Sequence, residues 1–364
     1  MTDSTQDKRL SRLGLKQEFR RSFSFEASFS LSFVVMSPLA GISIGLTYAW
    51  IVGGPGAAMW GWVVVSFFTL VVGLAMAEIV SGLPSSGGPY FWASLLAGRH
   101  SGLLSWITGW CNLFGQIAIT AGSAFGAMTN LVAMVQLLTG ITVSEVYQLL
   151  IQLGFLLIGG AVSSCSPKRI ARVFAYGAFV NFAGIIFVVL LLPTVAPWHK
   201  SSKFVFATFF TKDQSQWNVP NNAYLWVQAT VIASNTLAGF DCCSHISEET
   251  MGADSSAPLA IVWSIAACAL VGYVLLLGML FCVQDSDRLL DPDAPAHGFA
   301  AGQLVWDVFD ARFESGAWST ICLALFVLAG CLGVIASVTS NSRMIFAFAR
   351  SKAVPFSHFF HGHW

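Results

Sequence analysis

The sequence contains 364 residues, of which 55% are hydrophobic and 10% are charged, and its formal net charge at pH 7 is zero. Soluble domains contain about 25% charged residues, so this composition excludes a soluble globular protein. The balanced charge and the lack of a basic stripe give no indication of a nucleic-acid partner.

Long uncharged stretches predict an all-α, polytopic helical membrane protein. A helix that crosses a lipid bilayer needs roughly 20 mostly apolar residues, and several gaps between charged residues are at least this long, as between Glu26 and Glu78. We predict eight spans, at residues 28–52, 57–82, 103–136, 146–164, 173–195, 223–241, 258–283 and 317–341. The protein is therefore expected to be an integral, multi-pass membrane protein.

The third stretch, residues 103–136, is long enough to hold two spans instead of one, and loop charge decides between the alternatives. Cytoplasmic loops carry the excess of Lys and Arg. With a single span there, 13 of the 18 Lys and Arg residues lie on the same side as the N-terminus. Two spans would move Lys168, Arg169 and Arg172 to the other side. We therefore predict one long, tilted helix and a cytoplasmic N-terminus, with the plasma membrane as the expected location.

Two of the predicted spans contain helix-breaking residues. The first contains the sequence SPLAGISIG, Ser37 to Gly45, in which Pro38 removes a backbone donor and clashes with the preceding turn. The sixth contains NTLAGFD, Asn235 to Asp241, in which a glycine lies just before an acid. Within lipid such breaks are tolerated where protein or a water-filled cavity surrounds them. The alternative for the first span is that proline only kinks a packed helix.

Interrupted spans that lie five apart are typical of an inverted-repeat (LeuT-like) transporter fold, with the substrate where the breaks face each other. The N-terminus of a half-helix suits a carboxylate, and freed carbonyls beside an acid suit an ammonium group or a cation. We predict a cytoplasmic tail at residues 1–26 and a transmembrane domain at 27–364. This domain would contain a first repeat at 27–195 and a partial second repeat at 223–350.

Two acidic residues are candidates for coupling or gating. Asp241 follows the break in the sixth span, where it would face a substrate amine or a coupling proton; alternatively, it is an interfacial acid. Glu78 lies near the cytoplasmic end of the second span. It is either an interfacial acid or a gate residue paired with Arg99 or Arg172.

The sequence CCSH, Cys242 to His245, does not predict a metal site. It supplies at most three ligands within four positions, whereas a structural zinc ion takes four, in spaced pairs. We interpret the cysteines as small packing residues and His245 as the start of the cytoplasmic exit. No Walker loop, dinucleotide fingerprint or nucleophile–base pair is visible, so we predict no cofactor and no enzyme.

Three separated motifs resemble the amino acid/polyamine/organocation (APC) superfamily of permeases, in particular its fungal and plant branch that carries GABA, choline and related amines. They are AMAEIVSGLPSSGGPYFW (Ala75–Trp92), AGFDCCSHISEET (Ala238–Thr250) and NSRMIFAFARSKAVPFS (Asn341–Ser357). The resemblance implies two inverted five-helix repeats, about twelve spans and transport coupled to an ion gradient, often of protons.

The resemblance also implies where the substrate binds. By matching position, Ala40, Gly41 and Ile42 form the unwound part of the first span, and Gly239, Phe240 and Asp241 that of the sixth. Phe240 could hold a cationic head by cation–π contact. The full set of predicted substrate-binding residues is Ser37, Ala40, Gly41, Ile42, Asn235, Gly239, Phe240 and Asp241.

The sequence ends at Trp364, after the eighth predicted span, so the fourth and fifth helices of the second repeat are missing from it. We expect a truncated gene product, a fragment or a faulty gene model of a permease. The expected function is secondary, proton-coupled transport of an amino acid or a related amine such as GABA or choline. The alternative is a transport-incompetent relative that senses nutrients or modulates a full-length permease.

Overall fold

A computed structural model describes residues 21–210 and 222–361, which are helical apart from loops and one isolated β-bridge between Phe23 and Thr250. Within these residues, seven helical stretches are long and apolar enough to cross a membrane. They are α2 (Phe25–Met36) with α3 (Pro38–Val52), α4 (Gly54–Gly82), α6 (Ser101–Thr139), α7 (Glu145–Ser163), α8 (Pro167–Val195), α14 (Ala253–Phe281) and α16 (Thr320–Arg350). The prediction of an all-α, polytopic fold is confirmed. Most of the predicted tail, residues 1–20, lies outside the described residues.

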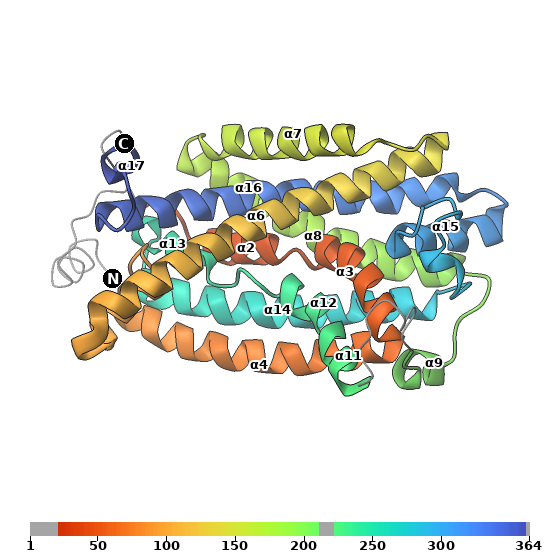
Figure 1. The fold of residues 1–364 in the computed structure, drawn as a ribbon, viewed down its shortest axis with the longest axis horizontal. Coiled ribbons are helices and arrows are strands. Elements are labelled where there is room, and N and C mark those ends of the chain that lie inside the picture. The colour runs from red at the N-terminus through yellow and green to blue at the C-terminus, as the bar shows by residue number, and fades with distance from the viewer. Residues whose placement is uncertain (1–20, 211–221, 362–364) are drawn as a thin grey trace.

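The third span is one helix, as the loop charges predict. Helix α6 contains 39 residues and runs obliquely across the bundle (Figure 1). It ends at Gly140, whose left-handed backbone (φ 68°) lets its N–H bond to the carbonyl of Gln136. Glycine adopts this conformation without steric cost, which makes it a common residue at helix C-termini.

The sixth predicted span, residues 223–241, crosses the bundle in pieces and not as one helix. It consists of α11 (Asn222–Ala229) and α12 (Val231–Thr236), and a non-helical stretch then leads to α13 (Cys242–His245). Figure 1 shows α11 at the end of the bundle that also holds α9 (Ser202–Ala207), and α13 at the opposite end. We refer to these two ends as the α9 end and the α13 end.

Glycines set the closest approaches between the long helices. The most extensive contacts join α4 to α14 and α6 to α16. A Cβ atom added at Gly330 of α16 would lie 3.0 Å from the Cβ and 3.1 Å from the Cα of Ala127 in α6. Similarly, Gly272 of α14 leaves room for the ring of Trp62, whose indole N–H donates to the carbonyl of Ala269 at 2.9 Å. Small residues that allow such close approach are typical of helix packing within membranes.

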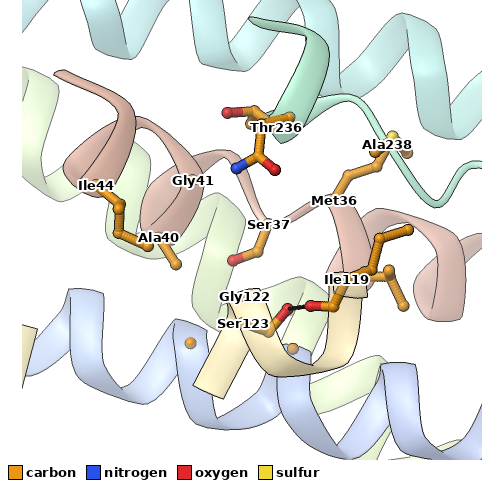
Figure 2. A pocket seen from close by; sticks show the side chains of 14 residues that line it. Met36, Ser37, Ala40, Gly41, Ile44, Ile119, Gly122, Ser123, Thr236 and Ala238 are labelled. Carbon is orange, nitrogen blue, oxygen red and sulfur yellow. Dashed lines mark hydrogen bonds between the residues drawn. The ribbon is translucent and has the colours of Figure 1, made fainter. Parts of the chain in front are cut away.

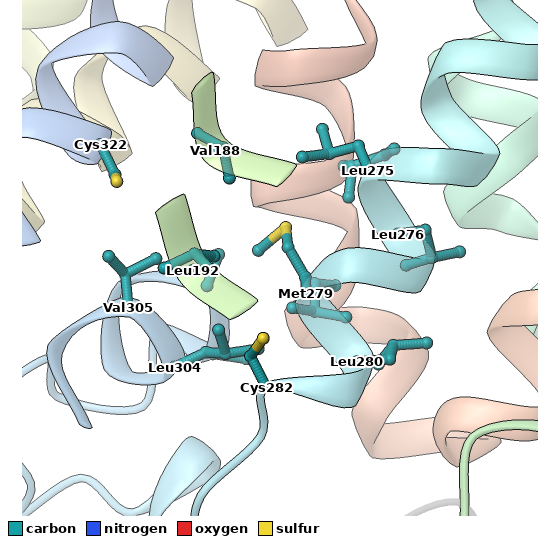
Figure 3. Packing of buried hydrophobic residues seen from close by; sticks show 14 of the residues in the cluster. Val188, Leu192, Leu275, Leu276, Met279, Leu280, Cys282, Leu304, Val305 and Cys322 are labelled. Atoms are coloured by element: carbon teal, nitrogen blue, oxygen red, sulfur yellow. The ribbon is translucent and has the colours of Figure 1, made fainter. Parts of the chain in front are cut away.

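The α9 end is closed by apolar side chains. Helix α15 (Ala300–Phe313), between α14 and α16 in sequence, places Leu304 and Val305 in the largest hydrophobic cluster. Figure 3 shows these side chains with Leu192 of α8 and Met279 of α14. All four are fully buried. The shorter helices that complete the chain are α5 (Pro89–Leu96), near the α13 end, and α17 (Ser357–His361).

The packing of α6 against α16 generates a first prediction. Gly330→Leu forces a branched side chain against the backbone of Ala127, and such overpacking costs about 1–3 kcal/mol. We expect the melting temperature of the purified protein in detergent to fall. The matched control is Gly154→Leu on α7, where an added Cβ has no atom within 4 Å. Equal melting temperatures for the two variants would contradict the proposed contact.

Candidate functional site

The break in the first span lies at a single residue, Ser37. Its backbone is left-handed (φ 35°, ψ 75°), α2 ends before it and α3 begins directly after it at Pro38. Proline suits the first position of a helix, because its fixed φ is helical and no N–H is needed there. The Ser37 hydroxyl donates to Oδ1 of Asn181 in α8 at 2.9 Å. This bond holds a backbone conformation that is strained for a residue other than glycine.

The prediction that Ala40, Gly41 and Ile42 are unwound is wrong. All three lie within α3, and the Gly41 N–H already bonds to the carbonyl of Ser37 at 2.8 Å. The physical reason is that Pro38 begins α3 directly after Ser37. The break therefore lies at Ser37, three residues before Ala40, where the unwound part was expected to begin. Ile42 is also fully buried in the largest hydrophobic cluster, which places it outside the cavity described below.

The break in the sixth span lies where the sequence predicts it. Residues 237–241 are non-helical, and Gly239 has a φ of +92°. A Cβ atom at Gly239 would lie 2.5 Å from Cγ1 of Val35 in α2, so this position also requires glycine for space. Ser32 of α2 joins the two sides of the break, because its hydroxyl donates to the Phe240 carbonyl at 3.2 Å and accepts from the Cys243 N–H at 3.1 Å.

The two breaks enclose a cavity of about 60 Å³ (Figure 2). Of the predicted substrate-binding residues, four line it: Ser37, Ala40, Gly41 and Asn235. The predicted residues outside its lining are Ile42, Gly239, Phe240 and Asp241. The volume suits a small solute, well below the roughly 300–1,000 Å³ of pockets for drug-sized ligands.

Several lining residues were not predicted from the sequence, among them Thr236, Gly122, Ser123, Gly330 and Gly333. Thr236 lies next to Gly41, where an added Cβ would be 2.7 Å from its hydroxyl oxygen. The remaining four are small residues of α6 and α16. Their only signal in the sequence is a pair of small residues within each long apolar stretch, which also occurs at simple helix crossings.

Asp241 lies between the cavity and the α13 end, in a cluster of polar side chains. Its Oδ2 atom is 3.5 Å from Nε2 of His245 and 3.5 Å from the amide nitrogen of Gln116 in α6. His245 is fully buried, although the sequence placed it at the start of the exit from the membrane. Cys242 and Cys243 are buried and unpaired with other cysteines, as expected of small packing residues.

The α13 end is closed by four charged residues, which we call the carboxylate clamp. Glu248 accepts from both terminal nitrogens of Arg350, at 2.8 and 3.0 Å, and Glu249 accepts from Nε of Arg343 at 2.9 Å. Glu248 also accepts from the backbone N–H of Ser86 at 3.0 Å. Both carboxylates are buried. Burial raises the pKa of the Glu249 carboxyl, and the guanidinium of Arg343 opposes this shift.

The carboxylate clamp was not predicted from the sequence. The signal was present in the spacing of Arg343 and Arg350, which lie seven residues apart and so share one face of α16.

Glu78 does not take part in this closure. Its side chain is exposed on α4, and within the described residues it forms no ion pair with Arg99 or Arg172. The predicted gate pair is therefore absent from this conformation. The physical reason is that this part of α4 turns outward from the bundle, since Val71, Val72 and Leu74 are exposed there as well.

Comparison with known proteins decides the family of this helical bundle. Residues 24–364 match the family model described as "Amino acid permease". The chain belongs to the amino acid permease family. It is therefore an integral, multi-pass membrane protein of a transporter family and not of an enzyme family, as the three motifs predict.

Three curated relatives cover nearly the whole of this permease. The amino-acid permease BAT1 homolog of Oryza sativa subsp. japonica is 35% identical over 361 residues, which are 97% of this chain and 69% of the rice protein. The amino-acid permease BAT1 of Arabidopsis thaliana is 34% identical with the same coverage. The GABA-specific permease of Saccharomyces cerevisiae is 28% identical over 96% of this chain and 60% of the yeast protein.

The requirement for glycine at the second break of this permease can be tested. Gly239→Ala places a methyl group 2.5 Å from Val35 and forces a side chain into a left-handed backbone conformation, which costs about 1–3 kcal/mol. We expect a lower melting temperature. Gly122→Ala adds the same methyl group to α6, where no atom lies within 4 Å, and should keep or raise it. A Gly239→Ala variant as stable as Gly122→Ala would show that the break tolerates a side chain.

The carboxylate clamp can be tested by a double-mutant cycle. Arg350→Gln leaves the buried Glu248 carboxylate without its bidentate partner, and breaking a buried pair costs about 3–5 kcal/mol. The double variant Glu248→Gln/Arg350→Gln should be more stable than the sum of the single effects, with a coupling of about 0.5–3 kcal/mol. Thermal unfolding in detergent measures both. The exposed Arg99→Gln is the control, and additive single effects would contradict the pairing.

Proposed function

We propose that this permease carries a small amino acid or related amine across the membrane by secondary, proton-coupled transport. The observation that carries the proposal is the meeting of two interrupted spans at one cavity. Ser37 lies at the first break and Thr236 is the last helical residue before the second, and both line that cavity. Breaks in spanning helices that face each other near the membrane centre are the usual construction of a transporter substrate site.

The chemistry of the cavity supports a substrate with both a carboxylate and an amine. The first N–H groups of α3, at Leu39 and Ala40, have no acceptor within their own helix, and a helix N-terminus attracts anions. The last carbonyls of α2 and α12 are the matching partners for an ammonium group. Ala40 and Thr236 bring these two kinds of helix end to the same cavity.

Among the candidate substrates, we favour GABA and related amino acids over choline. Choline lacks a carboxylate for the N-terminus of α3. The predicted aromatic partner for its cationic head, Phe240, is outside the cavity lining and gives its carbonyl to Ser32. One of the relatives is named a GABA-specific permease, which supports the same choice.

We further propose that the α13 end faces the cytoplasm and that the protein resides in the plasma membrane. This end holds Arg99, Arg343 and Arg350 and follows the positive-inside bias of the loops. The coupling role is assigned to Asp241, the acid nearest the break in the sixth span. In the alternative, a transport-incompetent sensor or modulator, the protein would cause no uptake of its own.

A cavity-filling pair of variants tests the proposed function. Labelled GABA, other amino acids and choline are supplied to cells that lack their own permeases. Ser123→Leu puts an isobutyl group on a half-buried residue of α6 that lines the cavity, and we expect uptake to fall at least about tenfold, because substrate and side chain compete for the same space.

The matched control is Gly115→Leu on the same helix, which is exposed and has no atom within 4 Å of an added Cβ. Both variants are compared at equal surface expression. Equal loss in both, or no loss in either, would contradict a substrate site at this cavity. Uptake that is the same with and without the wild-type protein would favour the sensor alternative.

A further inference from the structure

The imidazole of His245 is buried between a backbone carbonyl and a carboxylate. Its Nδ1 atom lies 3.1 Å from the carbonyl oxygen of Ser86, in the loop between α4 and α5. Its Nε2 atom lies 3.5 Å from Oδ2 of Asp241, one helical turn earlier. The side chain itself is fully buried, so water does not satisfy either nitrogen from the surface.

The number of protons on this pair follows from its neighbours. A carbonyl oxygen only accepts hydrogen bonds, so Nδ1 of His245 carries a hydrogen. In a neutral ring Nε2 is then an acceptor, and it would present its lone pair to the ionised carboxylate of Asp241. One proton on Nε2 turns this repulsion into attraction between an imidazolium and a carboxylate 3.5 Å apart.

The amides that surround the pair compensate only weakly for a missing proton. Asn112 lies 3.5 Å from Nε2 of His245, and Gln116 lies 3.5 Å from Oδ2 of Asp241. Both amides are neutral donors, so neither supplies the positive charge that a proton on the imidazole places beside the carboxylate.

We propose that Asp241 and His245 form one proton-binding site, which holds a single proton while the α13 end is closed. The inference rests on the proposed function, and it names the site of the coupling proton and adds His245 to the coupling machinery. The only bond that changes is N–H or O–H. The proton binds from water on one side of the membrane and leaves to water on the other, and the pair then consists of neutral imidazole and carboxylate.

The groups around Asp241 and His245 do not balance the charge of this pair, so its net charge depends on its own proton. From the segment after α13 and from α16, the charged groups are those of the carboxylate clamp, which pair with each other. Helix α13 adds the thiols of Cys242 and Cys243, α5 adds the hydroxyl of Tyr90 and α14 adds Asp254 near its start. Helix α6 contributes amides and α2 contributes the hydroxyl of Ser32. Loss of the proton therefore leaves one net negative charge on the pair, on an Asp241 side chain that is only 16% exposed.

The same pair connects the substrate cavity to the closure of the α13 end. His245 bonds to the carbonyl of Ser86, and the N–H of Ser86 bonds to Glu248 of the clamp. Gly88 packs so closely on the ring that an added Cβ would lie 2.9 Å from Cε1 of His245. Repulsion between Asp241 and a deprotonated ring would push the ring against this loop. Release of the proton and opening of the α13 end are thus one event.

The test separates proton coupling from transport itself. The chain of residues 1–364, wild type or His245→Asn, is reconstituted in proteoliposomes with labelled GABA. The Asn amide can still donate to the Ser86 carbonyl but binds no proton. We expect wild-type uptake to rise about fivefold or more as the external pH falls from about 7 to about 5, with accumulation above equilibrium. His245→Asn should lose both properties and retain exchange of labelled for unlabelled GABA.

Controls distinguish the possible failures. His100→Asn, an exposed histidine near the same end, should behave as wild type. If His245→Asn does not reach the membrane folded, His245→Gln, with its amide near Nε2, and Asp241→Asn test the same site and should show the same loss of accumulation. Accumulation and pH dependence that survive in these variants overturn the proton site. A wild-type protein with neither uptake nor exchange of GABA, amino acids or choline would instead overturn the proposed function.

Discussion

The structure depends on the rule that every backbone polar group within a bilayer needs a partner, because lipid offers none. Two spans of this chain are interrupted, and each interruption is stabilised by the other parts of the bundle. The hydroxyl of Ser37 is held by Asn181, and both sides of the second break are held by Ser32. A break of either kind on a lipid-facing helix would leave carbonyls and N–H groups without partners. The cavity lies between the two breaks, beside the first N–H groups of α3, which have no acceptor within their own helix.

Steric constraints keep the two breaks together. Gly239 has no room for a Cβ atom against Val35, and Gly41 has little against Thr236. The second span of each predicted repeat packs on its counterpart, α4 on α14, and the third does the same, α6 on α16. The first spans meet in the same way through α3 and α12. This pairing of equivalent helices brings the two interruptions to the same place in the bundle.

Hydrophobic spacing and loop charge predicted eight spans, and seven of them are long helices in the described residues, α6 included. Burial in lipid leaves a strong signal of this kind along the chain. The site was predicted less completely. Family-matched positions put the first break at Ala40–Ile42, whereas Pro38 fixes it at Ser37. The carboxylate clamp was missed because its partners, Glu248 and Arg350, are separated by 102 positions, and only tertiary packing brings them together. Asp241 was predicted from the sequence as a coupling residue, whereas its contact with His245 became visible only in the structure, where one helical turn separates them.

The two ends of the bundle are closed by different physical means, and this difference bears on the proposed transport cycle. At the α9 end Leu304 and Val305 lie in a dry cluster, and exposing such side chains costs roughly 25 cal/mol per Å². At the α13 end the closing contacts are ion pairs and polar hydrogen bonds. Separating a buried ion pair returns both charges to water, so the loss of attraction is largely offset by regained hydration. If the proposed transport cycle holds, we therefore expect the polar end, which contains Asp241 and His245, to open at the smaller energetic cost.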